Sequence, residues 1–347
     1  MTAPLSWGML RTRPGGTGAA ETPEPRQVRE EAAVRRPFWA PPGNLPGCLY
    51  FAMSNPPICN YEGSDYQASF WERGGRAYED AVEAIALRRL LPGSGKLMLE
   101  LGAGAGRNTP RYQAFERVAL VDYSRTQLEQ AQQRLGAGDR FIYVAADIYH
   151  LPFAGGLFDA ATMIRTLHHM ADAPQALKQA RRALQPGAVF ILEYANKQNV
   201  KAILRYLLHR QAWSPFTTEP VEFAELNFDF HPRAVRGWLK EAGFILQRQL
   251  TVSHYRIELL KRLVPLGLLV WMDSMAQLSG DWWQITPSVF ARAQADEQAF
   301  ESQPGAFFAC PSCGAGLPEA HQDLVCPSCG RTWPYTRGIY DFRLPGI

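Results

Sequence analysis

Three alternating glycines directly follow a short apolar stretch that carries one acid. Residues 98–107 read Met-Leu-Glu-Leu-Gly-Ala-Gly-Ala-Gly-Arg, so Glu100 stands two residues before Gly102, and Gly104 and Gly106 follow at the same interval. Glycine lets the backbone turn sharply after a buried strand, and its missing Cβ leaves space for a nucleotide-like ligand to approach the chain. The pattern therefore predicts a nucleotide-binding loop at the end of a strand.

The acid in this stretch indicates which kind of nucleotide the loop binds. A dinucleotide pyrophosphate is an anion that binds at a helix N-terminus, and the fixed carboxylate of Glu100 would repel it. A sulfonium cofactor with a free ammonium group tolerates or attracts such a carboxylate. The dinucleotide fingerprint also requires a third glycine where this chain has Arg107. The loop therefore favours a sulfonium cofactor.

Two further acids close the next two predicted strands. Residues 117–122, Arg-Val-Ala-Leu-Val-Asp, end on Asp122, which lies 22 residues after Glu100. At the end of the second strand of a doubly wound sheet, its carboxylate is expected to accept hydrogen bonds from ribose hydroxyls. Residues 140–147 form a third β-rich run that ends on Asp147. Three acids at successive strand ends are more specific than a glycine turn, which alone is often an ordinary tight connection.

This arrangement resembles the first motifs of class I S-adenosylmethionine-dependent methyltransferases, in particular type 11-like methyltransferase domains, over roughly residues 61–295. The resemblance implies S-adenosylmethionine as cofactor, with Asp147 against the adenine amino group. It also implies a Rossmann-like, doubly wound α/β fold with a seven-stranded sheet. The cofactor-binding residues that we predict are Glu100, Gly102, Gly104, Gly106, Asp122, Tyr123, Asp147 and Ile148.

The elements that must hold these residues follow along the chain. Apolar and β-branched runs predict further strands at residues 158–164, 188–194 and 288–293. Helical periodicity predicts helices at residues 124–135, 172–184 and 231–242, with Ser124 and Asp172 as the N-caps of the first two. Gln185-Pro-Gly is expected to form a turn before the strand at 188–194.

Four cysteines near the C-terminus form two C-x-x-C pairs. Cys310-Pro-Ser-Cys313 and Cys326-Pro-Ser-Cys329 are each followed by glycine and are separated by 12 residues. Each pair suits a tight knuckle that points two thiolates at one ion, so the two together predict a closed tetrahedral zinc site. Four cysteine ligands leave no position for water, so this zinc would be structural. Two disulfides or a redox C-x-x-C are the alternatives, and the duplication and the lack of a secretion signal disfavour both.

The residues after the second knuckle add a partial resemblance of about 40 residues. Residues 333–340, Trp-Pro-Tyr-Thr-Arg-Gly-Ile-Tyr, are similar to the Tyr-Pro-x-x-x-Gly-Ile tail of a small zinc-ribbon family that activates tRNA, rRNA and translation-factor methyltransferases. Trp333 replaces the tyrosine, and Tyr340 stands where a proline often follows. The resemblance implies that the chain carries in cis a module that other systems recruit in trans.

The charge balance disfavours nucleic acid as a partner. A net charge of +3, from 36 basic and 33 acidic residues, gives no large field to attract a polyanion. Residues 305–347 contain three arginines and three acids, and a zinc-tetrathiolate would add negative charge. We therefore expect a small-molecule acceptor, and nothing in the sequence indicates an oligomeric state.

The first 52 residues differ in composition from the rest. Eight prolines fall between positions 4 and 46 without helical or strand periodicity, which predicts a disordered tail. No signal peptide or membrane-spanning stretch is expected, so we predict a cytoplasmic protein. Met53 begins a sequence of globular character, and translation from Met53 instead of Met1 is a hypothesis that mass spectrometry of the native N-terminus tests.

The residues after the fourth predicted strand are the candidates for catalysis. Methyl transfer from a sulfonium depends mainly on positioning the nucleophile, so it needs no fixed triad. Residues 165–169, Arg-Thr-Leu-His-His, lie where open α/β sheets bind ligands. His168 and His169 are candidate general bases, and the alternative role for both is to form the pocket wall. The Asn/Asp-Pro-Pro-aromatic box of exocyclic-amine methyltransferases and a nearby cysteine for pyrimidine C5 chemistry are both missing here.

Two insertions are expected to shape the acceptor pocket. Residues 197–230 are rich in aromatic side chains, and residues 253–284 contain a strongly apolar helical stretch interrupted by Pro265 and Gly267. An aromatic and apolar cap favours a small lipophilic or aromatic methyl acceptor. RNA or a translation protein recognised through the ribbon is an alternative acceptor, and an inactive cofactor-binding scaffold is a third hypothesis. The predicted domains are a tail at 1–52, a methyltransferase domain at 53–300 and a zinc ribbon at 305–347.

Overall fold

The computed structural model describes residues 56–64, 75–300 and 303–344 of the chain. The predicted tail at residues 1–52 lies outside the described residues. From Ser54 onward the chain forms one compact unit. None of the described helices combines the length and the apolar character that crossing a bilayer requires.

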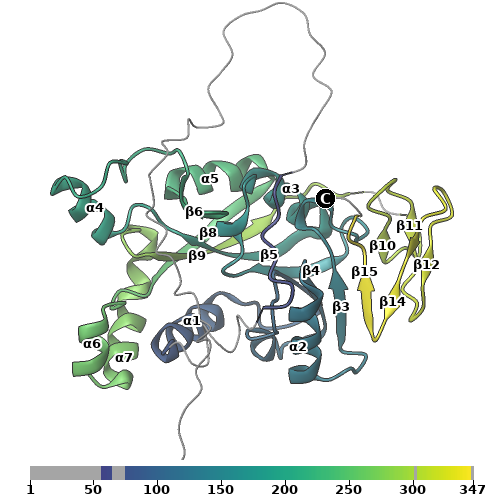
Figure 1. The fold of residues 1–347 in the computed structure, drawn as a ribbon, viewed down its shortest axis with the longest axis horizontal. Coiled ribbons are helices and arrows are strands. Elements are labelled where there is room, and N and C mark those ends of the chain that lie inside the picture. Colours follow the sequence, from purple (N-terminus) through teal and green to yellow (C-terminus); the bar gives the residue numbers. More distant parts are fainter. Residues whose placement is uncertain (1–55, 65–74, 301–302, 345–347) are drawn as a thin grey trace, which may run out of the picture. The chain divides into compact units, whose positions relative to one another are not determined.

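A central sheet of nine strands organises this unit (Figure 1). Across the sheet the strands are β14 (Tyr335–Thr336), β15 (Ile339–Asp341), β3 (Phe141–Ala145), β2 (Phe115–Asp122), β1 (Gly95–Leu101), β4 (Phe158–Met163), β5 (Leu184–Ala195), β9 (Ser288–Ala295) and β8 (Phe244–Val252). The neighbours from β15 to β5 run parallel, and β9 is antiparallel to both β5 and β8. Seven of the nine strands form the predicted doubly wound sheet, which confirms the fold class.

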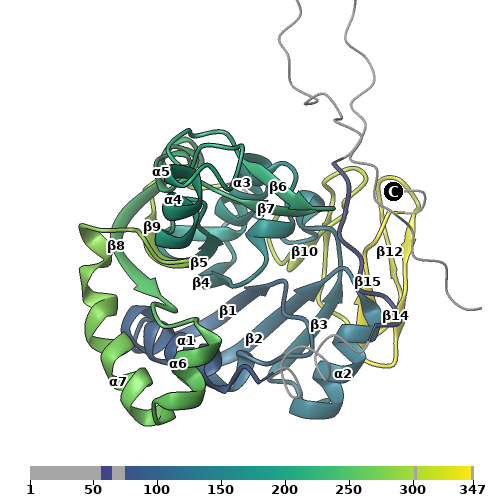
Figure 2. The ribbon, with the colours of Figure 1, turned by 60° about the vertical axis from the view of Figure 1, so that its left-hand side comes forward.

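Helices cover both faces of the sheet, as Figure 2 shows. Helices α1 (Ala77–Leu90), α2 (Arg125–Leu135) and α7 (Leu266–Ala276) pack on one face, whereas α3 (Ala173–Ala183) and α5 (Pro232–Glu241) pack on the other. Successive side chains of a strand point to opposite faces, and accordingly Met98 and Leu99 of β1 belong to different apolar clusters. Both faces of the sheet are therefore buried, as the continuous apolar runs in its strands predict.

The predicted helix N-caps form as expected. The Ser124 side chain accepts a hydrogen bond from the Gln127 amide, and Asp172 accepts one from the Gln175 amide. His231 caps α5 in the same way. Each cap satisfies an amide that the helix itself leaves without a partner, so these short polar side chains determine where the crossover helices begin.

Two details of the predicted elements are wrong. The Gln185-Pro-Gly segment is not a separate turn, because β5 already begins at Leu184. Gly187 has a φ of +76° inside this strand, and the pairing of β4 with β5 shifts register beside it, so a bulge takes the place of the turn. Pro265 separates α6 (Glu258–Leu263) from α7 as predicted, but Gly267 lies within α7 and does not interrupt it.

The first insertion is only partly helical. It contains helix α4 (Val200–Leu207) and an antiparallel hairpin of β6 (Val221–Ala224) and β7 (Asn227–Asp229). Phe230 then makes an isolated parallel bridge to Asn196, which lies just past the end of β5. The insertion is thereby tied to the carboxyl end of the sheet.

The cysteine-rich segment shares the core of the sheet. Strands β10 (Phe308–Ala309) and β11 (Gly316–Leu317) form one small hairpin, and β12 (Leu324–Val325) and β13 (Thr332–Trp333) form another. Phe308 stacks on Phe153 with ring centroids 5.7 Å apart, and β15 continues the central sheet beyond β3. The sequence predicted a small appended ribbon, and the structure integrates that ribbon into the edge of the sheet.

Candidate active site

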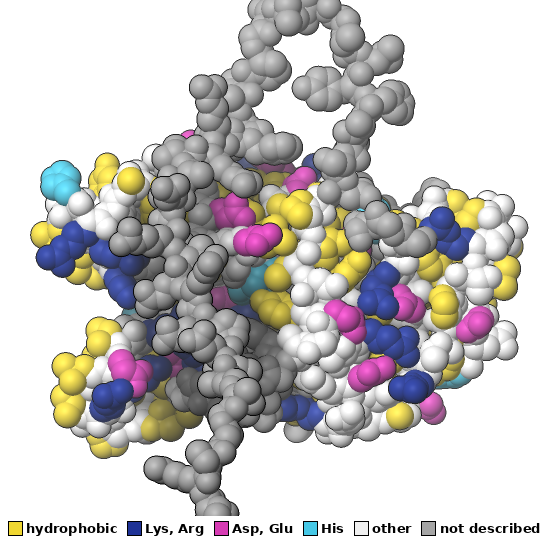
Figure 3. All heavy atoms as spheres, in the orientation of Figure 1, with side chains coloured by type: hydrophobic (Ala, Val, Ile, Leu, Met, Phe, Trp, Pro, Cys, Tyr) yellow, Lys and Arg dark blue, Asp and Glu magenta, His cyan; other side chains and the backbone are white. Residues whose placement is uncertain are grey.

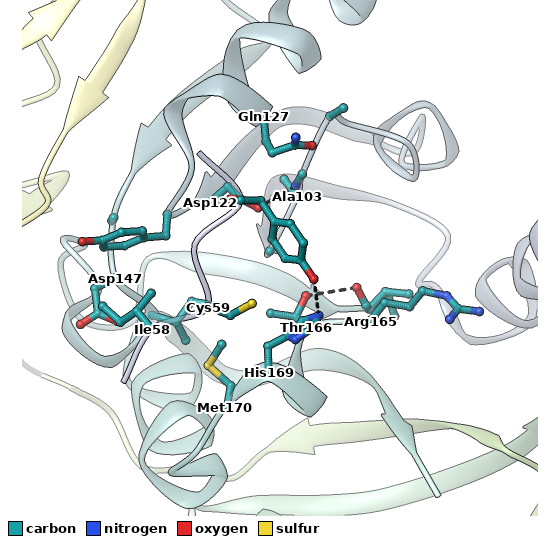
Figure 4. Close-up of a pocket in the computed structure, with 18 of the residues that line it drawn as sticks. Ile58, Cys59, Ala103, Asp122, Gln127, Asp147, Arg165, Thr166, His169 and Met170 are labelled. Carbon is teal, nitrogen blue, oxygen red and sulfur yellow. Dashed lines mark hydrogen bonds between the residues drawn. The ribbon is translucent and has the colours of Figure 1, made fainter. Parts of the chain in front are cut away.

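A cavity opens at the carboxyl ends of β1, β2, β3 and β4 (Figure 4). Open parallel sheets place their ligands at this position, because the loops after the strands converge there. Six of the eight predicted cofactor-binding residues line the cavity, namely Gly102, Gly104, Asp122, Tyr123, Asp147 and Ile148.

The glycine loop has the conformation that its sequence requires. Gly102 and Gly104 have φ values of +68° and +54°, in the left-handed region that favours glycine. A Cβ on Gly102 would lie 2.1 Å from the Thr166 hydroxyl, so this glycine allows the loop to pack against the segment after β4. A Cβ on Gly104 would have no protein atom nearer than 3.9 Å and would instead enter the space of the cavity. Gly102 thus allows close packing of the loop, and Gly104 leaves space for a ligand in the cavity.

Asp122 links this loop to the end of β2. Its carboxylate accepts hydrogen bonds from the amides of Gly104, at 2.8 Å, and Ser124, at 2.9 Å. Burial raises the pKa of the Asp122 carboxyl to about 6. Each carboxylate oxygen has a second lone pair beyond the bond it already makes, so the group can still accept hydrogen bonds from ligand hydroxyls in the cavity.

Asp147 is held in place at the end of β3. One carboxylate oxygen accepts a hydrogen bond from the Tyr149 amide at 2.9 Å, and the other lies 2.7 Å from Nδ1 of His150. These contacts cap the short helix η3 (Ile148–His150), which begins at the cavity. The buried carboxylate is therefore oriented before any ligand binds.

Two of the predicted cofactor-binding residues, Glu100 and Gly106, do not line the cavity. Thr109 and Tyr112 donate hydrogen bonds to the Glu100 carboxylate at 2.6 and 3.3 Å, and burial raises its pKa to about 7. Gly106 faces α2 instead, where an added Cβ would meet Leu135 at 2.8 Å. Both residues support the loop from behind, and the sequence pattern alone does not distinguish this role from ligand contact.

Arg107, which replaces the third glycine of the dinucleotide fingerprint, joins a buried ion-pair cluster. It donates to Glu83 of α1 at 2.8 Å and also pairs with Asp80. Arg165, directly after β4, binds the same Glu83. The Glu83 carboxylate is fully buried, and its two arginine partners hold its pKa below the usual range. Helix α1 is thereby tied to both loops that border the cavity.

His169 lines the cofactor cavity and contacts Tyr61. Its Nδ1 lies 3.0 Å from the Leu226 carbonyl, which can only accept, so Nδ1 carries the proton. In the neutral ring Nε2 is then an acceptor, and the Tyr61 hydroxyl donates to it at 3.2 Å. Burial lowers the pKa of His169. The imidazole is thus neutral and fixed between the insertion and the segment before α1.

A second cavity, of about 610 Å³, adjoins the first and shares Tyr61, Arg165 and His169 with it. His168 lines only this second cavity, and within the described part of the chain its buried Nδ1 has no hydrogen-bond partner. Burial lowers the pKa of His168 well below its usual value, so this ring is also neutral at pH 7. Both histidines that the sequence predicted therefore line the second cavity, and only His169 also lines the first.

Other residues that line the second cavity were not named as site residues, although the first insertion was expected to shape the acceptor pocket. The first insertion contributes Trp213 and Phe223, and Arg256 follows β8. Glu193 near the end of β5 is buried, accepts hydrogen bonds from the Arg165 amide and the Ser288 hydroxyl, and has a pKa raised by burial. Its position as an acid near a strand end is the signal that could have identified it.

The four predicted metal ligands converge on one point. The sulfurs of Cys310 and Cys329 are 3.7 Å apart, those of Cys313 and Cys326 are 3.4 Å apart, and all four lie within 4.8 Å of one another. A tetrahedral zinc ion with Zn–S distances of about 2.3 Å separates its sulfurs by about 3.8 Å, whereas a disulfide needs about 2.05 Å. The geometry fits a single ion and does not fit disulfides.

Comparison with known proteins agrees with the geometry of the first cavity. Residues 99–192 match the model of a methyltransferase domain. The chain is 28% identical to a demethylmenaquinone methyltransferase of Clavibacter sepedonicus over 48% of this chain and 73% of that protein. It is 29% identical to the 27-O-demethylrifamycin SV methyltransferase of Amycolatopsis mediterranei, over 36% of this chain and 49% of that protein.

Among solved structures, an S-adenosylmethionine dependent methyltransferase from Mesorhizobium loti is similar with a TM-score of 0.47 and 18% identity, over 63% of this chain and 100% of that one. The family match runs from within β1 to within β5 and so includes the ends of β1 to β4, which form the first cavity. Residues 99–192 therefore form a methyltransferase domain of the S-adenosylmethionine-dependent kind.

Proposed function

We propose that this protein transfers the methyl group of S-adenosylmethionine to a small apolar or aromatic acceptor bound in the second cavity. The observation that carries the proposal is that the two cavities share Tyr61, Arg165 and His169. A cofactor on the glycine loop and an acceptor beside His168 would then meet at this shared wall. Holding two reactants in line supplies much of the acceleration of such a displacement.

The chemistry requires little from the protein besides positioning. A lone pair of the acceptor forms a bond to the methyl carbon, the carbon–sulfur bond breaks, and its electron pair remains on sulfur to give S-adenosylhomocysteine. An oxygen, nitrogen or acidic carbon nucleophile must lose a proton before or during this step. His168 is suited to take it, because its ring is neutral and its Nδ1 has no hydrogen-bond partner among the described residues.

The lining of the second cavity supports an acceptor with an aromatic body and polar substituents. Trp213 and Phe223 offer aromatic surface, and Asn227 offers hydrogen-bonding groups. Two relatives are named as methyltransferases of demethylmenaquinone and of 27-O-demethylrifamycin SV, which agrees with a small-molecule acceptor. The relatives are matched over only part of their length, so this support concerns the acceptor class and not its identity.

We further propose that Cys310, Cys313, Cys326 and Cys329 bind one structural zinc ion, and that residues 305–347 are a ribbon domain attached to a methyltransferase domain at 53–300. Four thiolates leave the ion no open position, so it would stabilise the knuckles without taking part in methyl transfer. Gly314 and Gly330, which follow the pairs, have φ values of +77° and +70° and permit the tight turn of each knuckle.

The decisive experiment incubates the full chain with radiolabelled S-adenosylmethionine and separated lipid, small-molecule, RNA and protein fractions of a cell extract. Label in the lipid or small-molecule fraction is expected, and it should be lost in Asp122→Ala. Label confined to RNA or protein would contradict the proposed acceptor. Cofactor binding without label in any fraction would show a cofactor-binding scaffold.

A further inference from the structure

Two groups of exposed apolar side chains lie on either side of the second cavity. The α4 patch follows helix α4 and the loop after it, and the α6–α7 patch covers residues 257–285. Both lie at the left end of the molecule in Figure 1, where Figure 3 shows yellow side chains on two protrusions. The α4 patch comprises Val200, Leu204, Leu207, Leu208 and Phe216. The α6–α7 patch includes Leu259, Leu263, Leu266, Trp271, Trp282 and Trp283.

These apolar side chains are largely exposed to solvent. Trp282 and Trp283 expose 76% and 66% of their surface, and Leu263 exposes 72%. Single exposed apolar residues are common. Contiguous groups of large apolar residues usually mark a site that binds a membrane or another protein. Tryptophan is enriched where an apolar medium meets water, because its ring is apolar and its N–H needs a polar partner.

The basic residues of the α4 patch indicate the charge of what covers it. Residues 198–218 contain Lys201, Arg205 and Arg210 but no acid, and all three basic side chains are exposed. Leucine and phenylalanine interleaved with lysine and arginine on a short amphipathic helix are typical of segments that lie in the headgroup region of anionic membranes. Face-to-face association of two such patches in a dimer would instead bring like charges together.

Both patches border the proposed acceptor cavity. Arg205 and Arg210 of the α4 segment line it from one side, and Arg256, the residue before the α6–α7 patch, lines it as well. A surface that covers both patches would therefore lie against the mouth of the cavity. A lipophilic acceptor dissolved in that surface could enter without crossing water.

We propose that the α4 and α6–α7 patches dock onto the surface of a bilayer that contains anionic phospholipid, and that the second cavity takes its acceptor from that bilayer. The membrane contact rests on the exposed patches, and only the route of the acceptor rests on the proposed function. The contact is a surface contact, in keeping with the finding that no described helix is suited to span a membrane.

The test is flotation of the full chain with vesicles of phosphatidylcholine alone or with 30% phosphatidylglycerol (about one lipid in three). We expect binding to the anionic vesicles, weakened by high salt because the lysine and arginine contribution is screened. Trp282→Ser/Trp283→Ser and Leu204→Ser/Leu207→Ser should each reduce binding at least about tenfold, since each removes large apolar groups from the interface. The matched control is Val325→Ser, which removes an apolar side chain that is 62% exposed on β12 of the ribbon.

Absence of wild-type binding to anionic vesicles would overturn the proposal, as would equal binding of all variants. Size-exclusion chromatography of the same samples identifies a competing outcome, in which the tryptophan variant abolishes a dimer and leaves vesicle binding unchanged. Calorimetric titration with S-adenosylhomocysteine should give the wild-type affinity in every variant. Loss of vesicle binding with intact cofactor binding and methyl transfer would contradict only the membrane proposal. Vesicle binding without methyl transfer would contradict only the proposed function.

Discussion

Ile339 of β15 pairs with Tyr143 of β3 in parallel register, so the segment after the second cysteine knuckle forms a strand of the central sheet. Ile339 is fully buried and packs in the same apolar cluster as Leu128 of α2. An edge strand left uncovered would present unpaired amides and carbonyls to solvent. The ribbon therefore protects the edge of the sheet on the side of β3.

The first prediction follows from this pairing and concerns the metal. Wild-type protein should contain one zinc per chain, and Cys313→Ser should lose the metal and unfold the knuckles, because the ion supplies most of their folding free energy. Hydrogen exchange should then accelerate in β3, whose partner strand is released. Elemental analysis and exchange mass spectrometry measure the two effects, with Ser312→Ala as the control inside the same knuckle. Full metal content in Cys313→Ser would contradict the four-cysteine site.

The second prediction concerns Asp122, which we propose to bind the ribose of the cofactor. Asp122→Ala should weaken binding of S-adenosylhomocysteine by about 1.5 to 3 kcal/mol if two hydrogen bonds to the carboxylate are lost. Glu116→Ala, an exposed acid on the same strand β2, is the control and should bind normally. Isothermal titration calorimetry measures both, and an unchanged dissociation constant for Asp122→Ala would remove this residue from the site.

The third prediction is a pH dependence of cofactor affinity. The pKa of Asp122 is about 6, above its usual value, so the free protein holds the carboxylate ionised at pH 8 and protonates it as the pH falls below 6. The ionised form is the better acceptor for ribose hydroxyls, so affinity should decrease as the pH falls through about 6. The same raised pKa means that this group destabilises the fold as the pH rises from about 4 to 6. Titrations between pH 5 and 8 should show the decrease in the wild type and not in Asp122→Asn.

The fourth prediction separates the two glycines of the loop. Gly102→Ala should lower the melting temperature, at a cost of about 1 to 3 kcal/mol, because its Cβ meets the Thr166 hydroxyl and its φ is positive. Gly104→Val should mainly weaken S-adenosylhomocysteine binding, because its side chain would occupy the cavity. Thermal melts and calorimetry on both variants measure the contrast. Equal melting temperatures with equal affinities would show that the loop does not contact the cofactor as proposed.

The fifth prediction tests the unpartnered histidine. If His168 removes a proton from the acceptor, His168→Asn should lower kcat about 100-fold or more while cofactor affinity stays unchanged, because this side chain does not line the cofactor cavity. Raising the pH should partly restore the rate by ionising the acceptor without the imidazole. Wild-type kcat in the variant would show that His168 only forms the cavity wall. Steady-state kinetics with the acceptor that the radiolabel experiment identifies provides the measurement.

Local signals in the sequence were sufficient for the cofactor loop, the helix caps and the cysteine knuckles. The φ values of Gly102 and Gly104 and the hydrogen bonds from the Ser124 and Asp172 caps depend on residues only a few positions apart. Such features are governed by backbone sterics and short-range hydrogen bonds, which residue types and spacing express directly. The doubly wound fold class came from the resemblance to class I methyltransferases, and it agrees with apolar runs that alternate with amphipathic helices.

Contacts between residues that are far apart in the sequence became known only from the tertiary structure. The Tyr61 hydroxyl reaches His169 across 108 positions, and Ile339 pairs with Tyr143 across nearly 200. Glu100 has the sequence context of a cofactor ligand, yet Thr109 and Tyr112 enclose it behind the loop. Contacts of this kind depend on how whole elements pack, and a residue's type does not reveal its distant neighbours. The sequence by itself determined the glycine loop and the cysteine knuckles, whereas packing determined the second cavity and the strand that the cysteine-rich segment adds to the sheet.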